Sequence, residues 1–141
     1  MGIFLDTGFF IALKNSRDIH HHAALNALAK MREKAYGQLY TSDYILDEAV
    51  TVAVSRTGRL DIVQDVGEFI LHSTFIQMLK VSEADLVQAW KLMVDYFDRK
   101  LSFTDCTNLA LIGTNQIQYL CTYDEMFNGL IAVITGEENL D

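Results

Sequence analysis

The sequence predicts an α/β fold in which a parallel sheet of four or five strands is covered by helices on both faces, a three-layer α/β/α sandwich. Short apolar runs alternate along the chain with longer segments of helical periodicity, the pattern typical of such a sheet. The 141 residues, half of them hydrophobic, suit one domain with a substantial core. No proline, repeat or low-complexity stretch marks a boundary, so residues 1–141 are interpreted as a single domain.

The first half of the chain is predicted to alternate strand and helix. The elements expected there are a buried strand, a short helix or turn, a helix, a second strand and a further helix, at residues 3–5, 7–13, 18–35, 38–41 and 42–58. Asp18 and Ser42 are the expected N-caps of the two longer helices, because their side-chain oxygens can accept a bond from a free helical N–H. Apolar residues at Ile62, Val66 and Ile70 then predict another helix.

The second half continues the alternation with strands expected at residues 75–81, 119–122 and 130–134. Ser82 and Asp85 resemble a capping box at the start of a helix. In that helix, apolar residues at helical spacing, Trp90 among them, predict a face turned to the core. Thr104 is the expected cap of the last helix.

Four apolar segments, far apart in the chain, each end on a carboxylate: Asp6, Glu48, Asp105 and Asp124. Asp6 and Asp124 follow the first and fourth predicted strands, and ligands of open α/β sheets bind beyond the carboxyl ends of strands. Asp105 falls in the first turn of a helix and Glu48 on the helix after the second strand. A buried carboxylate is costly without a cation or donor, so four that converge predict a cation site.

Each of these acids also has a purely structural interpretation. Asp6 is in place to cap the following segment, Asp105 to complement a helix dipole, and Asp124 to make a turn. Asp47 competes with Glu48, because adjacent helical residues point about 100° apart and only one can face the site.

Charge and composition restrict the classes of function. The net charge of −8 argues against a general nucleic-acid surface, so affinity for a polyanion would have to come from bound metal and local basic clusters. The basic residues expected in loops and at helix ends are Lys14, Arg17, Arg56, Arg59, Arg99 and Lys100. The two cysteines lie in apolar settings without metal-ligand spacing. No apolar run has membrane-spanning length, and a cytoplasmic location is expected.

Together the four acidic segments resemble the four motifs of the PIN domain, a family that includes VapC-type toxins and RNA-processing endonucleases. The segments are Phe4-Leu5-Asp6-Thr7, Leu46-Asp47-Glu48-Ala49-Val50, Ser102-Phe103-Thr104-Asp105 and Thr122-Tyr123-Asp124-Glu125-Met126-Phe127. The resemblance covers residues 3 to about 134 and implies a PIN-like sheet of Rossmann-like topology. It also implies an endoribonuclease that hydrolyses RNA phosphodiesters and acts as the toxin of a toxin–antitoxin pair.

The resemblance assigns both the metal-binding and the catalytic role to Asp6, Glu48, Asp105 and Asp124, holding Mg²⁺ or Mn²⁺. Hard divalent ions prefer such oxygen ligands. Thr7 and Thr104 are candidates to orient the carboxylates or a metal-bound water. Asn108, one helical turn after Asp105, is a candidate to bind a metal-bound water or a substrate phosphate. The family also suggests a homodimer and a small antitoxin protein as partners, with RNA as the substrate.

Other functions remain alternatives at this point. The same residues fit an RNA-processing nuclease without an antitoxin, or a non-catalytic α/β module that binds RNA or protein. No nucleotide-binding glycine motif is present, and Asp6-Thr7-Gly8 lacks the paired acids of receiver domains and of haloacid-dehalogenase-like phosphatases. The run His20-His21-His22 fans around a helix axis, so these residues cannot share one ion. A solvated helix start is favoured for them, with RNA contact by one histidine as the alternative.

Overall fold

The computed structural model describes residues 1–138 and contains a five-stranded sheet in the order β3-β2-β1-β4-β5. All neighbouring strands are parallel, which confirms the predicted sheet. The strands are β1 (Gly2–Leu5), β2 (Gln38–Ser42), β3 (Ile76–Leu79), β4 (Tyr119–Cys121) and β5 (Ala132–Ile134). Every strand end lies within two residues of its predicted position, and β3 and β5 are shorter than expected.

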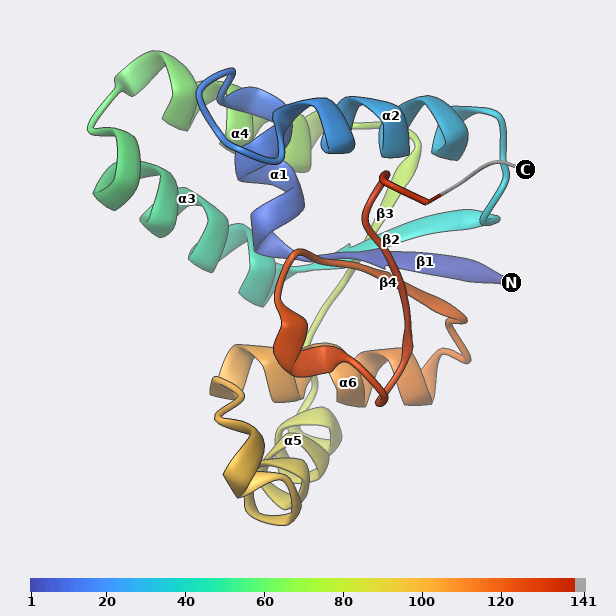
Figure 1. Ribbon diagram of the computed structural model, residues 1–141. Helices are drawn as coiled ribbons and strands as arrows, with labels where there is room; N and C mark the ends of the chain where they lie inside the picture. The colour runs from blue at the N-terminus through green and yellow to red at the C-terminus, as the bar shows by residue number, and fades with distance from the viewer. Residues whose placement is uncertain (139–141) are drawn as a thin grey trace.

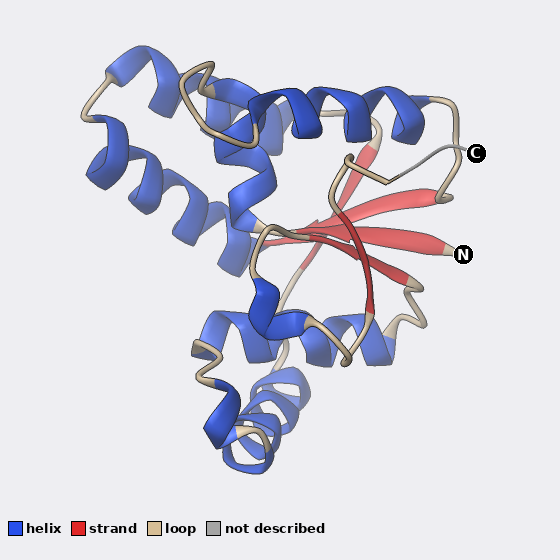
Figure 2. Cartoon of the chain, viewed as in Figure 1, coloured by secondary structure: helices blue, strands red, loops and turns tan. Residues whose placement is uncertain are grey.

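Helices cover both faces of this sheet (Figures 1 and 2). They are α1 (Thr7–Lys14), α2 (His21–Arg32), α3 (Asp43–Thr57), α4 (Leu60–His72), α5 (Glu83–Asp95) and α6 (Phe103–Thr114), with short 3₁₀ turns η1 (Phe97–Arg99) and η2 (Glu125–Phe127). In Figure 1, α1, α2 and α4 lie on one side of the sheet, α5 and α6 lie on the other, and α3 extends from the edge where the strands end. Within the described residues, no helix combines the length and apolar character needed to span a membrane.

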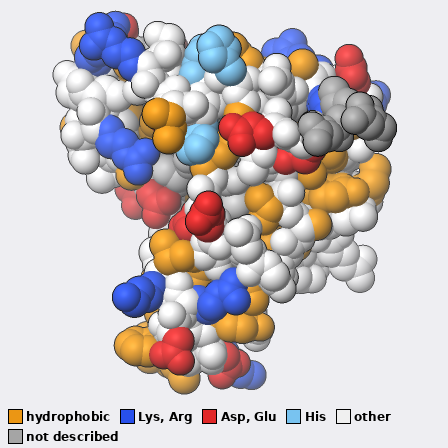
Figure 3. All heavy atoms as spheres, viewed as in Figure 1, with side chains coloured by type: hydrophobic (Ala, Val, Ile, Leu, Met, Phe, Trp, Pro, Cys, Tyr) orange, Lys and Arg blue, Asp and Glu red, His pale blue; other side chains and the backbone are white. Residues whose placement is uncertain are grey.

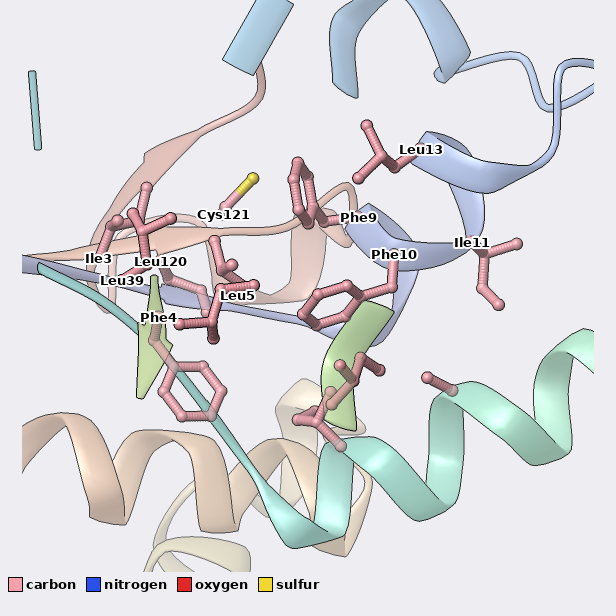
Figure 4. Close-up of a cluster of buried hydrophobic side chains, with 14 of the residues drawn as sticks. Ile3, Phe4, Leu5, Phe9, Phe10, Ile11, Leu13, Leu39, Leu120 and Cys121 are labelled. Atoms are coloured by element: carbon pink, nitrogen blue, oxygen red, sulfur yellow. The ribbon is translucent and has the colours of Figure 1, made fainter. Parts of the chain in front are cut away.

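The core is centred on β1, whose sequence is apolar because both faces of a central parallel strand are covered. Ile3, Phe4 and Leu5 have no exposed surface. Phe9 and Phe10 of α1 are equally buried, and Figure 4 shows them in the same cluster as the side chains of β1 and β4. This rigid centre fixes the position of the residue that follows β1.

The strand order changes direction beside β1. From β1 the chain proceeds to β2 and β3 on one side, and it then crosses to β4 and β5 on the other. The backbone N–H of Asp6 still donates to the carbonyl of Cys121, at 3.1 Å, just beyond the last strand pair. In open α/β sheets such a reversal leaves a crevice outside the carboxyl ends of the strands, where ligands bind.

Two helix starts differ from the sequence prediction. Asp18 does not cap α2, because its side chain accepts the N–H of His20 in a preceding turn and His20 occupies the N-cap position. Thr104 does not cap α6, because Ser102 holds that position in a capping box with Asp105. The expected caps Ser42 and Ser82 are confirmed at α3 and α5.

The prediction that Trp90 belongs to the core is wrong. The helix α5 packs on α6, and its fully buried apolar residue is Ala89. Trp90 is 62% exposed and Phe97 is 73% exposed. Val87 and Val94 are exposed on the same helix, so an apolar stripe points away from the sheet.

Candidate active site

Asp6 follows β1 directly and is only 6% exposed. One carboxylate oxygen accepts hydrogen bonds from the backbone N–H of Thr7, at 2.8 Å, and from the side-chain amide of Asn108, at 3.1 Å. The other oxygen accepts the hydroxyl of Thr122 at 2.7 Å. Because these donors belong to α1, α6 and the segment after β4, three elements fix the orientation of this carboxylate.

Burial raises the pKa of Asp6 to about 7, because the charged form loses its hydration. The hydrogen bonds from Thr122 and Thr7 oppose this rise, whereas the negative charges of Asp105 and Glu48 add to it. Asp6 therefore lies in the field of two further acids, and within residues 1–138 it forms no ion pair with a basic side chain.

Asp105 occupies the third position of α6 and is 8% exposed. Its carboxylate accepts the N–H of Ser102 at 2.9 Å, while its own N–H donates to the Ser102 hydroxyl at 3.0 Å. This reciprocal capping box fixes the side chain at the helix start. Burial raises the pKa of Asp105, and the charges of Asp124 and Glu48 raise it further. The structural and functional interpretations of this residue are thus compatible.

Glu48 lies on α3 and is half-buried, while its neighbour Asp47 is exposed. The hydroxyl of Thr7 donates to a carboxylate oxygen of Glu48 at 2.6 Å. Since the N–H of Thr7 binds Asp6, this single residue connects the acid after β1 with the acid of α3.

Asp124 follows β4 and caps η2, where its carboxylate accepts the N–H of Met126 at 2.9 Å. Its own N–H donates to the hydroxyl of Thr122 at 3.1 Å. Thr122 therefore links Asp6 and Asp124, a role that the sequence analysis missed. Its place in the same short motif as Asp124, next to a predicted strand end, was the signal that pointed to it.

All four acids line one pocket of about 350 Å³ at the carboxyl edge of the sheet. Figure 3 shows acidic side chains gathered in the middle of this face of the molecule, with Lys and Arg side chains above and below them. The remaining lining residues are Thr7, Gly8, Asp18, His20, Val52, Arg56, Thr122 and Tyr123. Sequence reasoning singled out neither Tyr123 nor Asp18 for this pocket.

The chemistry of the pocket fits a hydrated divalent cation. Within residues 1–138, no three His, Cys, Asp or Glu side chains are already arranged around a common ion position. The only salt bridge in that range joins Arg59 to Asp61, so none of the four acids is paired with a cation. Buried, mutually repelling carboxylates of this kind require positive charge, and Mg²⁺ binds through one or two carboxylates while it keeps several waters.

The three residues expected to support the acidic site, Thr7, Thr104 and Asn108, differ in their contacts. Thr7 binds Asp6 and Glu48 as described, and Asn108 is fully buried against Asp6. Asn108 contacts the Asp6 carboxylate from behind the residues that line the pocket. Its side-chain oxygen has no hydrogen-bond partner among the described residues. Thr104 does not line the pocket, and in the described part of the chain its side chain has no hydrogen bond to the acids.

The three consecutive histidines separate, as expected. His20 lines the pocket, a ring nitrogen of His21 lies 2.7 Å from the carbonyl oxygen of Ala12, and His22 is exposed. Of the basic residues considered from the sequence, Arg56 is the one that lines the pocket. Arg99 instead donates to the backbone carbonyls of Met126 and Asn128, next to the segment that carries Asp124.

Comparison with protein families and curated sequences gives concordant matches. The family model of the PIN domain matches residues 3–130. The chain is 32% identical over 127 residues to the 23S rRNA-specific endonuclease VapC20 of Mycobacterium tuberculosis, covering 89% of this chain and 92% of that protein. It is 22% identical over 131 residues to a VapC ribonuclease of Archaeoglobus fulgidus, covering 91% of this chain and 80% of that protein.

A solved structure supports the same relationship. The crystal structure of Mycobacterium tuberculosis VapC20, described as a sarcin-ricin loop cleaving toxin, matches with a TM-score of 0.77 and 28% sequence identity. The match covers 91% of this chain and 94% of that one. The similarity therefore extends over the sheet, its flanking helices and the segments that carry the four acids.

Proposed function

This chain belongs to the PIN domain family, and we infer from that membership and from its VapC relatives that it is an endoribonuclease of the toxin type. The observation that carries the proposal is the convergence of Asp6, Glu48, Asp105 and Asp124 in one pocket at the strand reversal. They come from four separate segments, and two of them are almost completely buried. Three of them also cap a helix or 3₁₀ turn, but carboxylates gathered in one pocket repel one another, and a bound cation would offset that repulsion.

We assign the binding of Mg²⁺ or Mn²⁺ to these four acids. A bound divalent ion supplies an acidified water and stabilises negative charge on the phosphoryl oxygens and the leaving group. The chain's own residues fix the ligands in advance. Thr122 and Asn108 hold Asp6, Thr7 holds Glu48, and the capping box at the start of α6 holds Asp105.

The substrate proposed for this chain is ribosomal RNA containing an exposed loop. The support is the printed specificity of the VapC20 relative for 23S rRNA and its description as a sarcin-ricin loop cleaving toxin. Unpaired loop nucleotides can be splayed out and reach a pocket, whereas the bases of an A-form duplex are inaccessible in its deep groove. The first assay therefore uses a sarcin–ricin loop RNA next to a fully duplex RNA of the same length.

The test of the proposed site compares Glu48→Gln with Asp47→Asn. Both changes remove one negative charge from adjacent positions of α3, but only Glu48 lines the pocket. We expect Glu48→Gln to lower the rate of RNA cleavage roughly 100-fold or more, because loss of even an outer residue of a metal site costs 10- to 100-fold. Asp47→Asn should retain the wild-type rate.

The same assay tests the metal. EDTA should abolish cleavage, and excess Mn²⁺ or Mg²⁺ should restore it. Cleavage that persists in EDTA would overturn the metal assignment, and equal rates for Glu48→Gln and the wild type would remove Glu48 from the site.

We further propose a cytoplasmic toxin that a small antitoxin protein neutralises, as the toxin description of the solved relative suggests. Expression of the chain alone should arrest growth, and co-expression of the antitoxin should relieve the arrest.

We also propose a homodimer formed through the exposed apolar stripe of Val87, Trp90, Val94 and Phe97, called here the α5 face. A contiguous apolar surface on a folded protein commonly marks an interaction site.

A further inference from the structure

One wall of the pocket is aromatic and is fixed independently of the four acids. The Tyr123 hydroxyl donates to the carbonyl of Thr135 at 3.0 Å. The His20 ring lies parallel to the Tyr123 ring, with centroids 4.2 Å apart and an angle of 4° between the planes. The Asp18 carboxylate accepts the backbone N–H of His20 at 2.8 Å, which holds the start of α2 in this position. The stack is therefore formed before any ligand binds.

The pocket also contains a positive charge that is not used elsewhere. Arg56 lines the pocket from α3, and its side chain is exposed. Within residues 1–138 the only salt bridge is between Arg59 and Asp61, so Arg56 forms no direct ion pair with the acids of the pocket. Acids, an aromatic pair and a guanidinium group thus share one concave site.

These three groups suit the base and the phosphates of an unpaired ribonucleotide strand. The acids would hold the metal ion at the cleaved phosphodiester, a planar aromatic group accepts a base by stacking, and a guanidinium contacts a neighbouring phosphate. One face of the His20 ring lies against Tyr123, and the residue lines the pocket, so the opposite ring face is the one that can accept a base. Packing of the helix start does not require this residue to line the acidic pocket, since Asp18 already fixes its backbone.

We propose that His20, supported by Tyr123, is a stacking subsite for the unpaired base next to the cleaved phosphodiester, and that Arg56 contacts the adjoining phosphate. This inference rests on the proposed ribonuclease function and adds to it the form of the substrate that the pocket accepts. With this subsite, an RNA binds productively only if the nucleotide at the cleaved bond is unpaired and splayed out.

The first test is kinetic and uses sarcin–ricin loop RNA with Mn²⁺. His20→Ala should raise KM roughly tenfold, within the range expected for one stacked base, with a smaller change in kcat. His20→Phe keeps a flat ring and should restore KM to within about threefold of the wild type. His20→Lys supplies a positive charge without a flat ring and should not restore KM. His22→Ala, which changes an exposed neighbour outside the pocket, is the matched control and should leave KM unchanged.

The second test measures stacking without requiring turnover. The same RNA carries 2-aminopurine next to the cleaved bond, and its fluorescence is followed by stopped flow with enzyme in excess. The wild type and His20→Phe should quench the fluorescence before any cleavage, and His20→Ala should not. Thermal melts by circular dichroism show whether each variant is folded. If His20→Ala does not fold, the comparison of His20→Phe with His20→Lys still tests the stacking subsite.

The outcomes separate this inference from the proposed function. Cleavage by the wild type with an unchanged KM and unchanged quenching in His20→Ala would overturn the stacking subsite and leave the nuclease intact. Rescue by Lys but not by Phe would also overturn it, since the residue would then act through charge. Quenching that depends on His20 in a protein that cleaves no RNA would support the subsite and reject the nuclease.

Discussion

The carboxylate of Asp6 is fixed in orientation, but its charged form is disfavoured. Three hydrogen bonds fix its carboxylate, yet burial and two neighbouring acids disfavour its charge. The pKa rises from 3.8 to about 7, so the folded chain keeps a proton that the unfolded chain releases between these values. The contribution of Asp6 to stability is complete below about pH 4 and is lost as the pH rises to 7.

This linkage predicts the pH dependence of metal-free protein. In EDTA, the free energy of unfolding of the wild type should fall by a few kcal/mol between about pH 4 and 7, in part through Asp6. Asp6→Asn removes this component and should be the more stable protein at pH 7.5, because Asn carries no charge to desolvate. Urea unfolding followed by circular dichroism at several pH values measures both effects.

Addition of metal to both proteins is the control for this prediction. Saturating Mn²⁺ should stabilise the wild type at pH 7.5 and have much less effect on Asp6→Asn, because a ligand that binds only the folded state adds stability. Identical pH slopes in the wild type and the variant would show that Asp6 is not the group responsible.

The sequence pointed to the four acids and to Thr7 and Asn108 beside them, but it did not reveal Thr122 or the contacts that these residues make. Each acid follows an apolar run, a local pattern that can be read without knowing the fold. Thr122 and Asn108 contact Asp6 across more than one hundred positions of sequence. Their roles depend on β1 lying beside β4 and on the position of α6, which only the strand order specifies. The stack of His20 on Tyr123 depends on the same arrangement.

At the scale of elements, the Ser-x-x-Asp pattern of a capping box correctly marks the helix starts where it occurs. Ser82 and Asp85 form the expected capping box. The same pattern is present at Ser102 and Asp105, but Thr104 was chosen as the cap there. The periodicity of α5 identified an apolar stripe without showing whether anything covers it. Trp90 is exposed because α5 packs on α6 and the core through Ala89, Leu92 and Met93.

The two capping boxes allow a matched test of what the start of α6 contributes to the site. Ser102→Ala and Ser82→Ala each remove one cap and should each cost about 1 kcal/mol of stability. Only Ser102 holds an acid of the pocket, so Ser102→Ala should also slow RNA cleavage roughly tenfold, whereas Ser82→Ala should not.

Urea unfolding and initial rates on the same preparations give both numbers. Equal loss of activity in Ser102→Ala and Ser82→Ala would mean that the cleavage rate falls only because the protein is less stable. The capping box at α6 would then have no specific part in placing Asp105.

At the scale of the whole molecule, charge and apolar surface are divided between two regions. The acidic pocket lies at the carboxyl edge of the sheet, where the strand order reverses. The α5 face lies on the outermost layer, beyond α6 (Figure 1). Neither Trp90 nor Phe97 lines the pocket, so an assembly through the α5 face leaves the pocket open to RNA. The proposed dimer should therefore form without covering the proposed site.

The proposed homodimer is testable through Trp90. The wild type should have about twice the chain mass of 16.0 kDa by size-exclusion chromatography with light scattering. Trp90→Ser should shift it to the monomer mass, because a buried aromatic residue near the middle of an interface contributes a large part of the binding energy. Leu60→Ser is the control, since Leu60 is 72% exposed on α4, away from the α5 face. A dimer that survives Trp90→Ser, or dissociates equally in Leu60→Ser, would contradict the assignment of the α5 face.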